Sequence, residues 1–167
     1  MKMLGLPGQD PATQAWMTTL LDAIGDANDT CTVARYRHWD SDQQPDVKFE
    51  AAQIDTTSVD LLVGKSLGTM ISLAAHKGYG LAPERAVFIG LPLVAYSDGL
   101  RDTLREFAST TPTLFIQQTA DRTAAYSDVV ECIGDCPQAT TVEVAGSNHV
   151  YSDIEELRAI ITGWLAG

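Results

Sequence analysis

Residues 59–68 read Val-Asp-Leu-Leu-Val-Gly-Lys-Ser-Leu-Gly, and this stretch decides the predicted fold. Its first half is a short apolar run typical of a strand buried in a parallel sheet. Its second half, Gly64 to Gly68, is a Gly-x-Ser-x-Gly pattern that leads into a helix-like segment. A sharp strand-to-helix turn of this kind strains the serine backbone and raises its hydroxyl above the sheet. The stretch therefore predicts a nucleophilic Ser66, and the alternative is an ordinary serine that caps a helix.

Short apolar runs alternate with helix-like segments along the rest of the chain, which indicates parallel strands joined by helical crossovers. The length of 167 residues is that of one globular domain, and no Ser/Gly-rich linker or internal repeat interrupts it. We therefore expect a single domain over residues 1–167. The predicted strands are Lys2–Leu6, Thr32–Arg37, Val59–Gly64, Ala86–Leu91, Thr113–Gln118 and Thr140–Ala145.

Capping residues and apolar spacing predict the helices between these strands. Asp10 and Pro11 favour the start of a helix that Gly25 ends. Ser152 and Glu155 have the spacing of a capping box before a last amphipathic helix. Residues 41–57 stay open between a short helix and an irregular connection. The other predicted helices are Leu67–Lys77, which Gly78 ends, Leu100–Ala108 and Ala124–Ile133.

Two polar residues follow later strands, where a serine nucleophile needs its partners. Asp121 ends a short loop after the strand Thr113–Gln118, and His149 ends a Gly-containing loop after the last strand. A carboxylate that orients a histidine, and a histidine that takes the serine proton, together activate a serine. Asp128 and Asp153 are weaker candidates for the acid, because neither directly follows a strand.

The strand, the Gly-x-Ser-x-Gly turn and the order serine, aspartate, histidine resemble the α/β-hydrolase superfamily. The local sequences of the loops around Asp121 and His149 resemble those of small hydrolases of the dienelactone-hydrolase-like type and of the testis-expressed and KAN-complex relatives. The resemblance implies an α/β fold with a doubly wound, mostly parallel six-stranded sheet in the strand order 2-1-3-4-5-6. It also implies a minimal core without a cap domain, since one helix fills the stretch between Ala86–Leu91 and Thr113–Gln118.

In this superfamily two backbone N–H groups form an oxyanion hole, which stabilises the negative charge that develops on the substrate oxygen. The resemblance assigns one of them to Leu67, the residue after the nucleophile. The second is expected in the loop after the first strand, with Gln9 as the preferred donor and Gly8 or Asp10 as alternatives. Leu6-Pro7-Gly8 stands there in place of the usual His-Gly motif.

An open site without a cap suits a small soluble acyl ester better than a long acyl chain, which needs a deep apolar pocket. We expect Leu93, Tyr96 and Val150 to line the substrate side, because each follows a strand end near the proposed triad. Lys65 has two interpretations. Either it holds an anionic group at the site, or its side chain extends to a surface acid.

Composition argues against several other functions. The chain has 11 Lys+Arg and 22 Asp+Glu, and a net charge of -11 repels nucleic acid and anionic lipid. No apolar run is long enough to cross a membrane. The three cysteines, Cys31, Cys132 and Cys136, lack the spacing of a zinc site or a disulfide framework, so we expect no metal and a reduced, cytoplasmic protein.

The sequence therefore predicts a serine hydrolase that needs no cofactor. Ser66 would form an acyl-enzyme from a small-molecule ester, thioester or amide, with His149 and Asp121 as its partners, and a carboxylic ester is the preferred substrate. Two alternatives stay open. One is a non-catalytic interaction protein that keeps the fold, and the other is an acyltransferase that uses the same three residues.

Overall fold

The structure is a computed structural model that describes residues 1–41 and 43–167. In this part of the chain six strands form one sheet, in the order β2-β1-β3-β4-β5-β6, and every neighbouring pair is parallel. This confirms the predicted sheet and its strand order. The strands are β1 (Lys2–Leu6), β2 (Thr30–Val33), β3 (Leu61–Lys65), β4 (Arg85–Ile89), β5 (Thr113–Gln118) and β6 (Ala139–Val144).

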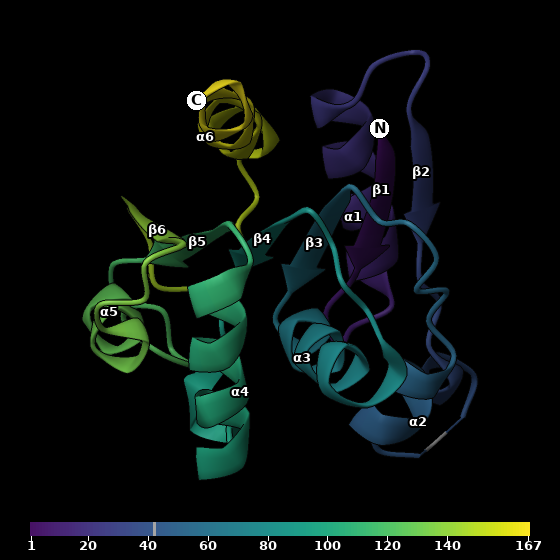
Figure 1. Cartoon of the computed structure of the whole chain (residues 1–167), viewed down its shortest axis with the longest axis horizontal. Helices are drawn as coiled ribbons and strands as arrows, with labels where there is room; N and C mark the ends of the chain where they lie inside the picture. Colours follow the sequence, from purple (N-terminus) through teal and green to yellow (C-terminus); the bar gives the residue numbers. More distant parts are fainter. Residues whose placement is uncertain (42) are drawn as a thin grey trace.

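Helices cover both faces of the sheet, as Figure 1 shows for α6 on one side and α3 and α4 on the other. Helices α1 (Ala12–Ile24) and α6 (Ile154–Ala166) pack on one face. The opposite face is covered by α2 (Val47–Ala52), α3 (Leu67–Tyr79), α4 (Asp98–Thr110) and α5 (Tyr126–Ile133). Between β4 and β5 the chain forms only a short 3-10 turn, η2 (Leu93–Ala95), and α4, so no cap domain is inserted there.

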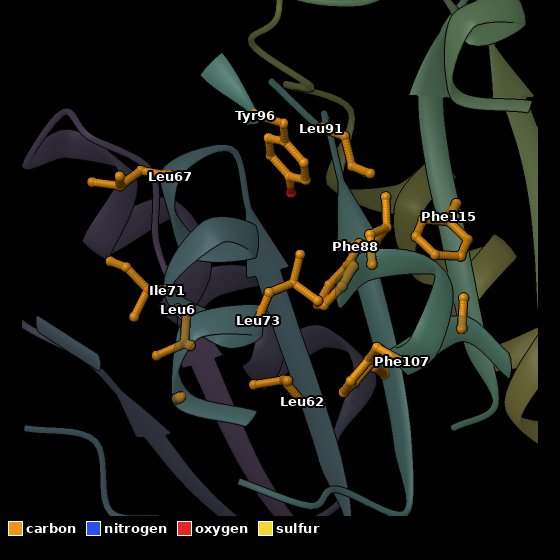
Figure 2. Packing of buried hydrophobic residues seen from close by; sticks show 14 of the residues in the cluster. Leu6, Leu62, Leu67, Ile71, Leu73, Phe88, Leu91, Tyr96, Phe107 and Phe115 are labelled. Carbon is orange, nitrogen blue, oxygen red and sulfur yellow. The ribbon is translucent and has the colours of Figure 1, made fainter. Parts of the chain in front are cut away.

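Alternation along the strands divides the core into two layers. On β3, Leu61 and Val63 face α1 and α6, whereas Leu62 faces α3. The α3 layer is rich in aromatic side chains (Figure 2), and the rings of Phe88 and Phe107 stack with their centres 5.5 Å apart. Both faces of the central strands are therefore buried, which explains why these strands read as continuous apolar runs. Among the described residues, no helix has the length and apolarity needed to span a bilayer.

The second strand differs most from its predicted bounds. We expected Thr32–Arg37, whereas β2 starts two residues earlier and ends at Val33. The N–H of Ala34 still bonds to β1, but Tyr36 then turns inward and is fully buried. Strand pairing stops there, and the chain continues as a 3-10 turn, η1 (Arg37–Asp40).

The end of α3 differs from its prediction, and the structure settles the stretch 41–57 that the sequence left open. Gly78 does not end α3, because Gly80 does so in a left-handed conformation (φ +77°) that favours glycine. The stretch 41–57 contains the short helix α2, which Asp46 caps, and Asp42 lies outside the described residues.

The N-cap of α6 lies one residue later than predicted. Ser152 and Glu155 were expected to form a capping box, but Asp153 is the cap and its carboxylate accepts a hydrogen bond from the backbone N–H of Glu156 at 2.9 Å. A carboxylate at this position also interacts favourably with the positive end of the helix dipole.

Candidate active site

Ser66 stands in the sharp turn between β3 and α3. Its backbone has φ +51° and ψ -115°, which residues other than glycine seldom adopt. Its N–H donates to the carbonyl of Ile89 on β4 at 3.0 Å. A Cβ on Gly68 would collide with the carbonyl oxygen of Leu6, so only glycine lets the end of β1 pass this close to α3. The strained turn thus has the tight geometry that the Gly-x-Ser-x-Gly pattern predicted.

Ser66, His149 and Asp121 form one hydrogen-bonded chain. Ser66 Oγ lies 2.8 Å from His149 Nε2, and His149 Nδ1 lies 2.7 and 2.9 Å from the two carboxylate oxygens of Asp121. A carboxylate only accepts hydrogen bonds, so Nδ1 carries the ring proton of a neutral His149. Nε2 then presents its lone pair to the Ser66 hydroxyl. The structure brings together the three residues that were predicted from three different loops.

Asp121 is held as a carboxylate by the groups around it. Its buried oxygens also accept hydrogen bonds from the N–H and hydroxyl of Thr123 and from the hydroxyl of Tyr151, each within 2.9 Å. Burial acts to raise the pKa of Asp121, but the hydrogen bonds from His149, Thr123 and Tyr151 outweigh it and lower the pKa to about 2. Burial raises the pKa of the Tyr151 phenol, which therefore stays protonated and donates.

The backbone of His149 is strained and is held from both sides. Its φ of +65° lies in the left-handed region. Its N–H donates to Gln118 Oε1 at 2.9 Å, and its carbonyl accepts from Lys65 Nζ at 3.1 Å. Asn148 Oδ1 accepts from the Gln118 amide at 3.2 Å, which ties the preceding residue to the same side chain. Side chains at the ends of two strands, β5 and β3, which lie on either side of β4, therefore fix the loop that carries the histidine.

The loop between β1 and α1 lies against the nucleophile. A Cβ on Gly8 would stand 3.6 Å from the Cβ of Ser66. In the part of the chain that the structure describes, the backbone N–H groups of Gly8 and Gln9 have no hydrogen-bond acceptor. Together with the N–H of Leu67 at the start of α3, these groups are available to a negatively charged oxygen near Ser66.

An aromatic segment holds this loop in place. The Tyr36 hydroxyl donates to the carbonyl of Pro7 at 3.0 Å. The carbonyl of Gln9 accepts from Trp39 Nε1 at 2.8 Å and lies 3.0 Å from His38 Nε2. Because a carbonyl only accepts, His38 carries a hydrogen on Nε2. Three side chains from the segment after β2 thus fix the carbonyls of Pro7 and Gln9, which flank the predicted oxyanion donors.

A cavity of about 650 Å³ opens beside Ser66 and His149. Val94 and Val150 are 77% and 52% exposed on its wall, so it has apolar surface that faces solvent. This volume fits a small molecule. No group of three or more His, Cys, Asp or Glu side chains among the described residues is placed to hold a metal ion. The other lining residues are Gly8, Gln9, Asp10, Ala12, Thr13, Trp16, Lys65, Pro92, Ala95, Arg122, Thr123 and Asn148.

Two of the three predicted lining residues are elsewhere. Leu93 and Tyr96 are buried in the core on the α3 side, and the Tyr96 hydroxyl lies 2.6 Å from that of Thr69. The η2 turn is the reason, because it points Leu93 inward and the next residue, Val94, outward into the cavity. Val150 lines the cavity as predicted.

Lys65 does not extend to a surface acid, because it is only 4% exposed. Strand alternation places it on the face that α1 and α6 cover, where Nζ lies 5.5 and 5.7 Å from the ring centres of Trp16 and Tyr151. Burial lowers the pKa of Lys65 to about 8; the charge of Asp121 opposes this shift and that of Arg122 adds to it.

Three side chains support the loops of the site in roles that the sequence did not predict. Tyr151, Gln118 and Trp39 each hold a loop of the site through a hydrogen bond, and none of them belongs to a recognisable sequence motif. One signal was present, since Gln117 and Gln118 are consecutive polar residues at the end of a buried strand. Buried amides of this kind need partners, and both hold loops at the site.

Comparison with known proteins establishes the fold. No protein-family model and no curated protein matches the sequence. An esterase from Exiguobacterium antarcticum has a TM-score of 0.76 at 12% identity, over 100% of this chain and 92% of that chain. An alpha-beta serine hydrolase homologue from Coxiella burnetii has a TM-score of 0.74 at 16% identity, over 98% of this chain and 84% of that chain. YbtT, a type II thioesterase of the yersiniabactin pathway, has a TM-score of 0.64 at 16% identity, over 99% of this chain and 91% of that chain. The chain therefore has the α/β-hydrolase fold.

Proposed function

We propose that this chain is a serine hydrolase that cleaves a small acyl ester through an acyl-enzyme on Ser66. The observation that carries the proposal is the hydrogen-bonded chain from Ser66 through His149 to Asp121, at the wall of an accessible cavity. The fold supports it, since the similar structures include proteins named as an esterase, a serine hydrolase homologue and a thioesterase.

In the proposed mechanism, His149 is the general base. Its Nε2 takes the proton of the Ser66 hydroxyl while Oγ attacks the acyl carbon. Asp121 holds the ring in the required tautomer and stabilises the imidazolium that forms. The imidazolium then gives its proton to the leaving alcohol, and the bond to that alcohol breaks. A water molecule, deprotonated by His149, attacks the acyl-enzyme and releases the acid.

The negative charge of the tetrahedral intermediate needs donors that are already in place. The N–H groups of Leu67 and Gln9 are the proposed donors, with Gly8 as the neighbouring alternative. The held carbonyl of Gln9 supports this assignment, because a loop fixed before the reaction does not have to reorganise during it.

Ester kinetics with matched variants test the proposal. We expect the wild type to hydrolyse short 4-nitrophenyl esters, and Ser66→Ala and His149→Ala each to lose at least about 10⁴-fold in kcat. Ser109→Ala and His76→Gln are the controls, because both residues lie outside the site. Turnover that survives in Ser66→Ala would show that the hydrolysis does not use this serine.

A further inference from the structure

Two cations share the cavity wall with Ser66, although the chain carries a net charge of -11. They are Lys65 and Arg122. Among the described residues, neither lies within ion-pair distance of a carboxylate. Asp10 is the acidic residue that lines this cavity, and one of its carboxylate oxygens accepts a hydrogen bond from the backbone N–H of Ala12. The charge of the wall is thus opposite in sign to that of the whole protein.

The Lys65 ammonium is buried without a counter-ion. It has three N–H groups, and in the described chain one protein acceptor, the carbonyl of His149, receives them. The oxygens of nearby Asp121 are already occupied by His149, Thr123 and Tyr151. A buried charge that lacks a partner is costly, and an anion that enters the cavity would compensate it. The lowered pKa of Lys65 reflects the same burial.

Arg122 follows Asp121 directly, so the end of β5 places it next to the triad. Its side chain is exposed and has no hydrogen-bond acceptor among the described residues. Other arginines of the chain are engaged: Arg85 and Arg101 donate to backbone carbonyls, and Arg105 pairs with an aspartate. The planar guanidinium of an unengaged arginine suits a carboxylate, which it can bind with two parallel hydrogen bonds.

We propose that the ester cleaved at Ser66 carries a carboxylate, which Lys65 and Arg122 bind. The apolar side chains on the wall, among them Val94 and Val150, would contact the carbon chain of the same substrate. This inference rests on the proposed hydrolase function and adds the chemical class of its substrate. It also selects the first of the two interpretations of Lys65 that the sequence allowed.

Two matched pairs of esters test the proposal. The first compares the mono-4-nitrophenyl ester of glutaric acid with 4-nitrophenyl valerate, so that the carboxylate lies on the acyl side. The second compares 4-acetoxyphenylacetate with 4-methylphenyl acetate, so that it lies on the leaving-group side. We expect kcat/KM of the anionic member to exceed that of the neutral one by about 10- to 100-fold in one of the pairs, which is the range of a charge-assisted hydrogen bond.

Variants separate substrate binding from a structural role. Lys65→Met and Arg122→Gln should each reduce the anionic-to-neutral ratio of kcat/KM by about tenfold. If Lys65 served only to hold His149, both esters would slow equally and the ratio would stay unchanged. Lys48→Met and Arg35→Gln are matched controls that keep the wild-type ratio, because both residues are exposed and lie outside the cavity.

Failure of this inference differs from failure of the proposed function. If neither ester pair shows a preference while a fluorophosphonate still labels Ser66, the substrate is not anionic and the hydrolase function stands. An unchanged ratio in both cavity variants overturns the inference equally. If the wild type neither reacts with the fluorophosphonate nor hydrolyses any of the four esters, the proposed function fails and the inference fails with it.

Discussion

The turn that carries Ser66 and the loop that carries His149 are both strained, but they are held in different ways. Ser66 has φ +51° and His149 has φ +65°. The serine turn is held by close packing of main chain, since Gly68 lets the carbonyl of Leu6 on β1 approach where a side chain would block it, and the N–H of Ser66 donates to Ile89 on β4. The histidine loop is held by Lys65 and Gln118, which are distant in sequence.

This difference teaches which half of the site depends on hydrogen bonds from individual side chains. A turn held by main-chain packing keeps its shape wherever β1, β3, β4 and α3 come together. A loop held by remote side chains keeps its shape only when those side chains are in place, and strain of this kind persists where the surroundings over-determine it. The histidine side of the site should therefore be sensitive to substitutions that leave the fold intact.

Asp121→Asn is the substitution on the histidine side with the largest expected effect on activity. The amide cannot hold the imidazole in the same tautomer, so kcat for an ester should fall by about 10³- to 10⁴-fold while the fold persists. Steady-state kinetics measure kcat, and circular dichroism shows whether the fold persists. Asp102→Asn is the matched control, because Asp102 is exposed and pairs only with Arg105. A loss below tenfold would remove Asp121 from the mechanism.

Gly68→Ala tests the serine side of the site through the stability of the folded protein. The added methyl group collides with the backbone of Leu6, and we expect a loss of about 3 kcal/mol in the free energy of unfolding. Gly78→Ala is the control in the same helix, where a Cβ meets nothing within 4 Å and should stabilise by about 0.5 to 1 kcal/mol. Urea denaturation compares the two. Equal effects would contradict a turn fixed by its own glycine.

The low pKa of Asp121 makes part of the stability depend on pH. Its ordinary value is 3.8 and its value in the folded protein is about 2, so the contribution is present above pH 4 and is lost as the pH falls towards 2. The difference in unfolding free energy between the wild type and Asp121→Asn should shrink by about 2 kcal/mol over this range. Urea titrations between pH 2 and 6 measure it. A constant difference would show that the hydrogen bonds around this carboxylate do not stabilise its charged form.

Tyr151→Phe tests the support that Tyr151, two residues after His149, gives to Asp121. The variant removes a donor to Asp121 and an acceptor for the N–H of Gln118, both at 2.8 Å. We expect a loss of about 1 to 2 kcal/mol in stability and a lower kcat for ester hydrolysis. Tyr79→Phe is the control, since Tyr79 is 45% exposed at the end of α3. Matching kinetics in the two variants would mean that Tyr151 does not position the acid.

Trp39→Phe has the smallest expected effect, because His38 still holds the carbonyl of Gln9. We expect kcat to fall by about threefold with little change in KM, since an oxyanion donor acts mainly in the transition state. Affinity for an alkyl boronic acid, which mimics that state, should weaken in parallel. Trp164→Phe on α6 is the control. A change in KM alone would argue that Trp39 contacts the substrate instead.

The sequence was sufficient for the sheet and for the three residues of the hydrogen-bonded chain. Buried parallel strands read as apolar runs, and the Gly-x-Ser-x-Gly pattern supplies the small residues that a tight strand-to-helix turn needs. Asp121 and His149 were found because each ends a loop directly after a strand, and parallel strands bring such loops to the same edge of the sheet.

The remaining features depend on directions and contacts that a sequence pattern does not contain. Leu93 was expected in the cavity, but the 3-10 turn η2 directs Leu93 into the core and Val94 into the cavity. Thr32–Arg37 was expected as a strand, but the burial of Tyr36 turned the chain away. Lys65 allowed two interpretations until its burial against Trp16 was known.

Reaction with a fluorophosphonate probe tests the central claim most directly, because it requires an activated serine and no knowledge of the substrate. We expect one adduct per chain in the intact mass of the wild type, mapped by peptide analysis to Ser66 and absent in Ser66→Ala and His149→Ala. Wild-type protein that is folded by circular dichroism and yet forms no adduct, or an adduct on another residue, would contradict the account.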